Sequence, residues 1–266
     1  RAAGSYIGEN FRSDLGFIRR TDIIKLYPEI KYTFWLEDSK LINHSFEITP
    51  VYVLKPSANN EISDYYIISK WDAELRNSSR IDLTMWNRYT YLYESFDPTG
   101  TNNGSPLPKN SKYYYTNFDL SFNSDYSKDF NYKINPSFGK FYNGYKTSVD
   151  LEISQRIRPK FISSLEISYD KVNLPQPYSS AKIFLIAPRF EFTFSKNIYW
   201  ATLVQYSNQN DNLSFNSRLQ WRFAPLSDLF LVYNDNYYTE NRYNSIFIPR
   251  ANNRSINLKL TYWLDI

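Results

Sequence analysis

The amino-acid sequence predicts an all-β protein, an antiparallel transmembrane β-barrel of about fourteen strands or a section of a larger barrel. First, apolar and polar side chains alternate along segments of roughly ten to fifteen residues, long enough for tilted membrane strands. Second, aromatic residues make up 19% of the chain, which suits rings at a boundary between lipid and water. Third, short and long connections alternate along the chain, as they do in outer-membrane barrels.

The last segment shows the alternation most clearly. Leu258 and Leu260 fall on one face, and Asn257 and Lys259 fall on the other, because successive side chains of a strand point to opposite sides. The sequence therefore predicts a terminal strand that contacts lipid and is recognised by the barrel-assembly machinery. Its lipid-facing residues are expected to be Leu258, Leu260, Tyr262, Leu264 and Ile266.

Three earlier segments, 149–158, 184–195 and 213–223, alternate in the same way. Aliphatic or aromatic side chains take one parity, and charged or polar side chains take the other. Such strands need one wet side, so we expect the polar set to face a hydrated lumen. That set comprises Asp150, Glu152, Arg156, Glu191, Arg218, Arg222 and Lys259, joined by Lys31, Arg76, Arg88 and Asp119 from less regular segments.

Weaker alternation predicts the remaining strands. Prolines inside some of these segments remove a ladder donor and leave the local register open. No apolar period of 3.6 residues persists, so we expect no substantial helix. The remaining strands are predicted at 2–7, 26–36, 44–54, 65–75, 81–93, 113–123, 130–138, 161–169, 198–206 and 229–233.

The connections support a barrel with short turns on one side and longer loops on the other. If the short side is periplasmic, the C-terminus also falls there. Residues 1–266 are read as one barrel domain. Because the chain starts Arg1-Ala2, without Met or a signal peptide, we expect an N-terminal portion of the native chain to be missing. Tight turns are expected at 38–40, 77–79, 125–128, 159–160, 196–197 and 225–228, and long connections at 8–21, 56–63, 97–111, 172–180 and 240–252.

Composition excludes several classes of protein. No stretch approaches the roughly 20 apolar residues of a spanning helix. The chain has no cysteine, which removes disulfides and thiolate chemistry. Its net charge of +4 is not gathered into a basic patch, so we expect no nucleic-acid partner. A mean hydropathy of −0.55 fits a barrel, because polar lumen residues offset the apolar band.

No catalytic, cofactor-binding or metal-binding residues are expected. His44, the single histidine, shares parity with Phe46 and Ile48 and is predicted to point outward, away from any nucleophile that it could activate. Asp150 and Glu152 stand two apart on one strand among arginines, which favours a charge ladder over an acid–base pair. No group of residues has the spacing of a metal site.

Tyrosine clusters at 113–115 and 237–238 flank long connections. Their rings could anchor the rim of a barrel in the membrane interface or stack on sugars outside it. We expect the first, because aromatic girdles are typical of outer-membrane barrels.

Segments 8–11 and 15–22, 219–223 and 227–234, and 258–264 resemble the bacterial family called domain of unknown function 5916. The resemblance implies an outer-membrane barrel that follows a carbohydrate-binding-like N-terminal domain, and no established activity. Leu226 stands where that family usually has glycine in a turn.

We therefore expect a non-enzymatic barrel in the cell outer membrane, which passes or binds small polar solutes or serves as a subunit of a larger envelope assembly. Its expected partners are outer-membrane lipid, the barrel-assembly machinery and other envelope proteins. Charges of both signs on the lumen face disfavour a channel for lipid or hydrocarbon. The alternatives are an outer-membrane barrel hydrolase and a soluble all-β carbohydrate-binding module.

Overall fold

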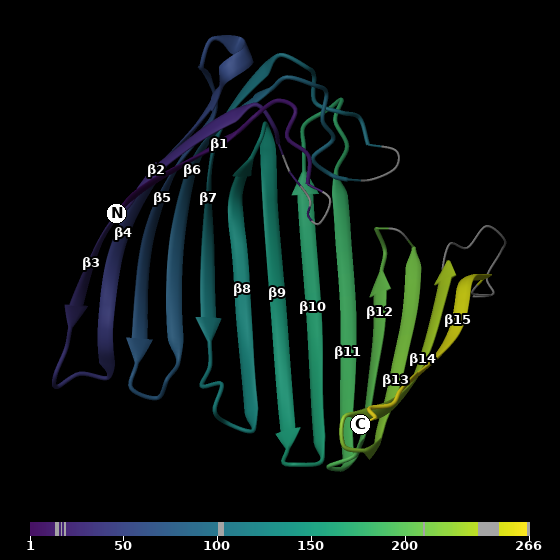
Figure 1. Ribbon diagram of the computed structural model, residues 1–266. Coiled ribbons are helices and arrows are strands. Elements are labelled where there is room, and N and C mark those ends of the chain that lie inside the picture. The colour runs from purple at the N-terminus through teal and green to yellow at the C-terminus, as the bar shows by residue number, and fades with distance from the viewer. Residues whose placement is uncertain are drawn as a thin grey trace. The chain divides into compact units, whose positions relative to one another are not determined.

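Figure 1 shows the computed structural model of the protein, which describes residues 1–13, 16, 18, 20–100, 104–209, 211–238 and 250–264. Within these residues the chain is all-β, with fifteen strands and one short 3₁₀ turn, η1 (Pro56–Ala58). No helix in this part of the chain is long and apolar enough to cross a membrane. The strands are β1 (Ala2–Ile7), β2 (Ile23–Pro28), β3 (Ile30–Trp35), β4 (Leu41–Lys55), β5 (Glu61–Leu75), β6 (Arg80–Leu92), β7 (Ser111–Asn123), β8 (Phe130–Phe141), β9 (Gly144–Ile157), β10 (Phe161–Asn173), β11 (Ala181–Ser195), β12 (Ile198–Ser207), β13 (Asn212–Ala224), β14 (Ser227–Tyr238) and β15 (Arg250–Thr261).

The strands form one antiparallel sheet in which neighbours follow chain order. The order is β1-β2-β4-β5-β6-β7-β8-β9-β10-β11-β12-β13-β14-β15, and β3 pairs with β4 off this path. Except for β3, each strand thus lies beside the preceding strand of this order, the simplest topology for hairpin-connected strands. Among the described residues no pairing joins β1 to β15, so the sheet has two edges and is not closed into a barrel.

The predicted strands are confirmed, with two differences. The terminal strand, predicted to run to residue 266, ends at Thr261, and the described residues 262–264 lie outside it. The second difference is at 26–36. This segment is two strands, β2 and β3, which pair with separate parts of β4: β2 with Tyr52 to Leu54 and β3 with Asn43 to Ile48. Pro28 ends β2, and Pro50 lies in the part of β4 between the two pairings. Both prolines lack the N–H that a continuous ladder would need, which explains the break.

The connections alternate in length only in part, because the connection expected to be long at 56–63 spans residues 56–60 and is no longer than the one after β3. Short ones follow β3, β5, β7, β9, β11 and β13, and long ones follow β1, β6 and β10. In the long connection after β6, Phe96 and Leu107 form an isolated antiparallel bridge, with the Leu107 N–H donating to the Phe96 carbonyl at 2.7 Å. Leu107 is fully buried, so this part of the connection is packed against other residues. Most of the connection expected at 240–252 lies outside the described residues.

The chain groups into two compact units. Unit 1 comprises residues 1–122, 135–148 and 171–181, and unit 2 comprises 123–134, 149–170 and 182–266. The single domain expected for 1–266 stays a prediction.

Leu226, in the turn between β13 and β14, has a φ of 55°. Side chains with a Cβ rarely adopt this left-handed conformation, whereas glycine adopts it freely. The turn geometry thus explains why glycine suits this position.

Gly139 of β8 permits a close approach to β7. Its φ is +148°, and a Cβ added there would lie 2.5 Å from the Asn117 Cα and 2.6 Å from the Thr116 carbonyl oxygen. Both are backbone atoms, which cannot move aside as a side chain can. The spacing of the two strands at this point therefore depends on glycine.

We predict that Gly139→Ala destabilises unit 1 by about 1–3 kcal/mol, as overpacking against rigid neighbours does. The measurement is the midpoint of thermal or denaturant unfolding, followed by the β-sheet signal in circular dichroism. Gly8→Ala is the matched control, because the nearest atom to its added Cβ is the Tyr6 Oη at 3.6 Å. Equal midpoints for the two variants would contradict the close approach.

Candidate functional site

The sheet has two chemically different faces, and the registers of unit 1 define them. Phe46 of β4 lies opposite Trp71 of β5, which lies opposite Leu83 of β6. One residue further along β4, Glu47 lies opposite Lys70 of β5. Apolar side chains therefore line up across the strands on one face, the apolar face, and charged side chains line up on the other, the polar face.

The exposed fractions of the side chains are the reverse of those in a soluble sheet. On the apolar face, Ile30 is 77% exposed, Tyr32 65% and Phe46 54%. On the polar face, Ser45 is 1% exposed and Thr49 8%. A sheet in water normally hides its apolar side chains and exposes its polar ones. The side chains named here do the opposite, whereas Val51 and Val53, which also lie on the polar face, are apolar and buried.

Several charged side chains on the polar face of unit 1 are paired with one another. The Lys31 Nζ lies 3.0 Å from the Asp72 Oδ1, and the Lys70 Nζ lies 2.7 Å from the Asp82 Oδ1. The Asn43 Nδ2 donates to the Glu74 Oε2 at 3.2 Å. Because the carboxylates of Asp72 and Asp82 are only 16% and 17% exposed, these pairs are partly shielded from water. The predicted lumen residue Lys31 thus belongs to a cross-strand ladder of alternating charge.

The same two faces recur in unit 2. Trp200 of β12 lies opposite Leu219 of β13, which lies opposite Leu231 of β14 and then Leu258 of β15. On the other face Tyr199 lies opposite Gln220, and Phe230 of β14 lies opposite Lys259 of β15. Lys259 thus falls on the face opposite Leu258, as the alternation predicts.

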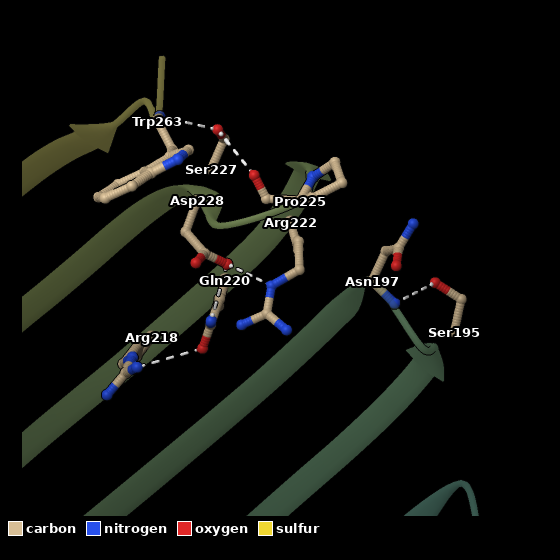
Figure 2. A network of polar contacts seen from close by, with 9 residues as sticks. All are labelled: Ser195, Asn197, Arg218, Gln220, Arg222, Pro225, Ser227, Asp228 and Trp263. Carbon is tan, nitrogen blue, oxygen red and sulfur yellow. Dashed lines mark hydrogen bonds and ion pairs between the residues drawn. The ribbon is translucent and has the colours of Figure 1, made fainter. Parts of the chain in front are cut away.

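A polar network lies at the short-turn end of β13 and β14, and Figure 2 shows its members. The Arg218 Nη2 donates to the Gln220 Oε1 at 3.2 Å, and the Gln220 Nε2 donates to the Asp228 Oδ1 at 3.0 Å. The same oxygen of Asp228 accepts from the Arg222 Nε at 3.2 Å. The structure thereby brings the predicted residues Arg218 and Arg222 together through Gln220 and Asp228, which the sequence did not single out.

The residues that follow β15 are tied to the same turn. The Trp263 N–H donates to the Ser227 Oγ at 3.1 Å, and that hydroxyl donates to the Pro225 carbonyl at 3.3 Å. Ser227 is fully buried. The turn between β13 and β14 therefore anchors the chain beyond Thr261.

The other predicted polar residues do not join that network through any contact in the described part of the chain. The Arg189 Nε donates to the Glu191 Oε1 at 2.6 Å within β11. In β9, Asp150 accepts from the Ser168 Oγ at 2.6 Å, and the Arg156 Nη1 donates to the Tyr126 carbonyl at 2.9 Å. Glu152 is exposed.

Arg76 and Arg88 differ in their surroundings. Arg76 follows the end of β5 and donates to the carbonyls of Ser39 at 2.6 Å and Leu36 at 3.1 Å, so it clamps the neighbouring short turn. Arg88 lies on the polar face of β6, where its Cζ stands 4.3 Å from the centre of the Trp86 ring. The Trp86 Nε1 donates to the Asp119 Oδ2 at 2.6 Å, which places Asp119 beside them.

The predicted lipid-facing residues of the terminal strand are all exposed where the structure describes them. Leu258 is 68% exposed and Leu260 64%, and both lie in β15. Tyr262 and Leu264 lie beyond the end of that strand and are 61% and 67% exposed. Ile266 lies outside the described residues. β15 is an edge strand, and residues on both of its faces are exposed, Asn257 and Lys259 included.

His44 lies on the apolar face, in line with its parity. Its ring stacks on that of Phe34 with centroids 4.9 Å apart and packs edge-on against Phe46 at 5.8 Å. Its Nδ1 is buried without a hydrogen-bond partner. Among the described residues no group of three or more His, Cys, Asp or Glu side chains could hold a metal ion.

Asp235 forms a cluster that sequence reasoning missed. By register it lies on the apolar face, opposite Phe215 and Arg254. Its Oδ2 accepts from the Tyr233 Oη at 2.6 Å, the Tyr237 Oη at 2.5 Å and the Arg254 Nε at 2.8 Å. The predicted strand 229–233 stopped short of Asp235, but the alternation of Tyr233, Asp235 and Tyr237 was a usable signal.

Among the described residues outside the strands, two titratable groups have shifted pKa values. In the short turn after β7, the hydroxyl and the backbone N–H of Ser127 hold the pKa of Asp125 below its usual value. In the long connection after β6, burial raises the pKa of Tyr93, and the negative charge of Glu61 adds to the rise.

Fold and site together define an antiparallel sheet protein with an exposed apolar face and an ion-paired polar face. The family model described as "Domain of unknown function (DUF5916)" matches residues 4–183, which is more than half of the chain. The chain belongs to this family. The resembling segment 8–22 lies inside the match, whereas 219–234 and 258–264 follow it and remain a resemblance. No curated protein matches the chain.

We predict that the Lys70–Asp82 pair contributes measurably to stability because it is partly buried. A double-mutant cycle with Lys70→Gln and Asp82→Asn should give a coupling energy of about 1 kcal/mol, the upper end for ion pairs near a surface. The control pair is Lys109–Glu94, at 3.2 Å with side chains 56% and 80% exposed, for which we expect coupling close to zero. A larger coupling energy for the control pair would show that partial burial on the polar face does not strengthen the Lys70–Asp82 ion pair.

Proposed function

We propose that this chain forms the wall of a β-barrel in the bacterial cell outer membrane, with the apolar face toward lipid and the polar face toward a hydrated interior. We propose further that it is non-enzymatic, and that it passes or binds small polar solutes or serves as a subunit of a larger envelope assembly. The observation that carries the proposal is the reversed exposure of the two faces, with Ile30 77% exposed and Ser45 1% exposed.

Strand length supports a membrane location. A tilted strand needs about 9–11 residues to cross the apolar core of a bilayer. β4 has 15 residues, β6 has 13, and β12, among the shortest beyond β3, has 10. Free edges are not tolerated in lipid, because unpaired backbone groups find no water there. The proposal therefore requires the edges at β1, β3 and β15 to pair with one another or with strands outside this sheet.

A row of tyrosines on the apolar face supports the same orientation. Tyr52, Tyr65, Tyr89 and Tyr114 lie on four consecutive strands, β4 to β7, with successive ring centroids 6.3, 5.3 and 4.8 Å apart. In β4 to β6 the row lies toward the long connections. A belt of rings at one end of the strands is typical of the interface between lipid and headgroups, which favours the girdle over sugar stacking for Tyr114.

The chemistry of the polar face supports a hydrated interior. It mixes carboxylates and cations, as in the Lys31–Asp72 pair and the Asp228 network. Such a surface is not a continuous apolar path for a lipid. The only histidine packs against the rings of Phe34 and Phe46, on the face opposite these carboxylates. These features favour solute passage or a scaffold role over hydrolysis.

The test compares two double variants of β15, each of which places two arginines on one face of the strand. Leu258→Arg with Leu260→Arg should abolish assembly into the outer membrane, because each arginine costs about 2–4 kcal/mol at the middle of a bilayer. Asn257→Arg with Lys259→Arg, on the other face of the same strand, should assemble like the parent chain. The measurement is the amount of heat-modifiable protein recovered from outer-membrane fractions.

Equal assembly of the two double variants would overturn the proposal. So would recovery of the parent chain as a monomer from the aqueous phase without detergent, which is the result expected of a soluble carbohydrate-binding module.

A further inference from the structure

The polar face of unit 1 contains a cavity of about 460 Å³ at the end of the strands where the long connections lie. Lys25 of β2, Asp64 and Tyr66 of β5, and Arg88 of β6 line it, and Arg20 reaches it from the connection between β1 and β2. Its volume falls within the range of small-molecule sites, roughly 300–1,000 Å³. The cavity can therefore hold a ligand of about the size of a sugar.

The cavity has an excess of positive charge. Asp64 is the one carboxylate among its described lining residues, and it already pairs with Arg20 and accepts from the Ser63 Oγ at 3.0 Å. Lys25 and Arg88 make no ion pair or hydrogen bond through their side chains to any residue that the structure describes. Two cations thus face the cavity without a neutralising partner.

The Arg88 guanidinium is fixed by neighbouring rings, although its N–H groups donate no hydrogen bond to any residue that the structure describes. Its guanidinium lies over the Trp86 ring, the Trp86 indole is tied to Asp119, and the Tyr66 ring lies 5.9 Å from that of Trp86. The Arg88 Nε is buried without a hydrogen-bond acceptor. A buried donor without an acceptor is unfavourable, and a fixed guanidinium matches the oxygens of a carboxylate or phosphate.

We propose that this cavity binds a small organic anion, a sugar-sized molecule that carries a phosphate or carboxylate, through Arg88 and Lys25. The anionic group satisfies the Arg88 donors and the Lys25 ammonium, and the body of the ligand lies against the Tyr66 and Tyr115 rings, which also line the cavity. This inference rests on the proposed function and narrows its class of polar solute.

The test is isothermal titration calorimetry on the detergent-purified chain with three probes: glucose 6-phosphate, glucuronate and uncharged glucose. At least one of the two anions should bind saturably, and the stronger one identifies the preferred anionic group. Glucose should bind at least tenfold more weakly, because the charged hydrogen bonds supply most of the affinity.

Variants separate the cavity from the net charge of the chain. Arg88→Gln and Lys25→Gln should each weaken binding of the preferred anion about tenfold or more. Arg88→Lys should bind with intermediate strength, because it keeps the charge and loses the fork of donors. Lys70→Gln is the matched control: it removes one positive charge from the same face, outside the cavity, and should bind like the parent chain.

Circular dichroism of each variant checks folding. Absence of saturable anion binding, equal binding of glucose, or equal losses in Lys70→Gln and Arg88→Gln would overturn the inference. These results are independent of the arginine substitutions in β15, so a barrel that assembles but binds no anion would overturn this inference alone. If the chain binds the anion but is recovered as a soluble monomer without detergent, that result would overturn the proposed function alone.

Discussion

The register of the antiparallel hydrogen-bond ladder decides the surroundings of each side chain in this sheet. Because side chains alternate with a period of two, a slip of one residue between neighbouring strands would move a whole row to the opposite face. The observed register sets Phe46 beside Trp71 and Glu47 beside Lys70. The cross-strand ion pairs, the tyrosine row and the cavity of unit 1 all depend on that alignment, since each is made by residues on different strands.

The alignment produces an apolar surface that water would not stabilise. Burial of apolar area is worth about 25 cal/mol per Å², and large side chains such as Ile30, Tyr32 and Phe46 are more than half exposed. The polar face needs no such covering, because its carboxylates pair with lysines or accept hydrogen bonds from neighbouring strands. The two faces thus differ in the way that the proposed placement between lipid and water requires.

The strands and short turns could be predicted from the sequence because their signals are local. Alternation over ten residues and turn residues such as Asn77-Ser78-Ser79 need no knowledge of distant parts of the chain. The break between β2 and β3 could not be predicted, because it depends on which parts of β4 each strand pairs with. Closure of the sheet also depends on long-range pairing.

The side-chain clusters were predicted only in part. The parity of Arg218 and Arg222 placed both on the polar face, but their meeting at Asp228 depends on the turn between β13 and β14. The cavity joins Arg20 and Asp64, which are 44 residues apart, and the Asp235 cluster needs Arg254 from the next strand. Alternation gives the face of a residue and not its neighbours across strands.

The most direct measurement of the two-faced sheet is a spin-label scan along β13 in lipid vesicles. The chain has no cysteine, so single substitutions such as Phe215→Cys, Asn216→Cys, Arg218→Cys and Leu219→Cys carry one label each. We expect accessibility to oxygen, which concentrates in lipid, at positions 215 and 219, and accessibility to a water-soluble nickel complex at 216 and 218. A profile without a period of two, or with the two positions of each pair reversed, would contradict the account.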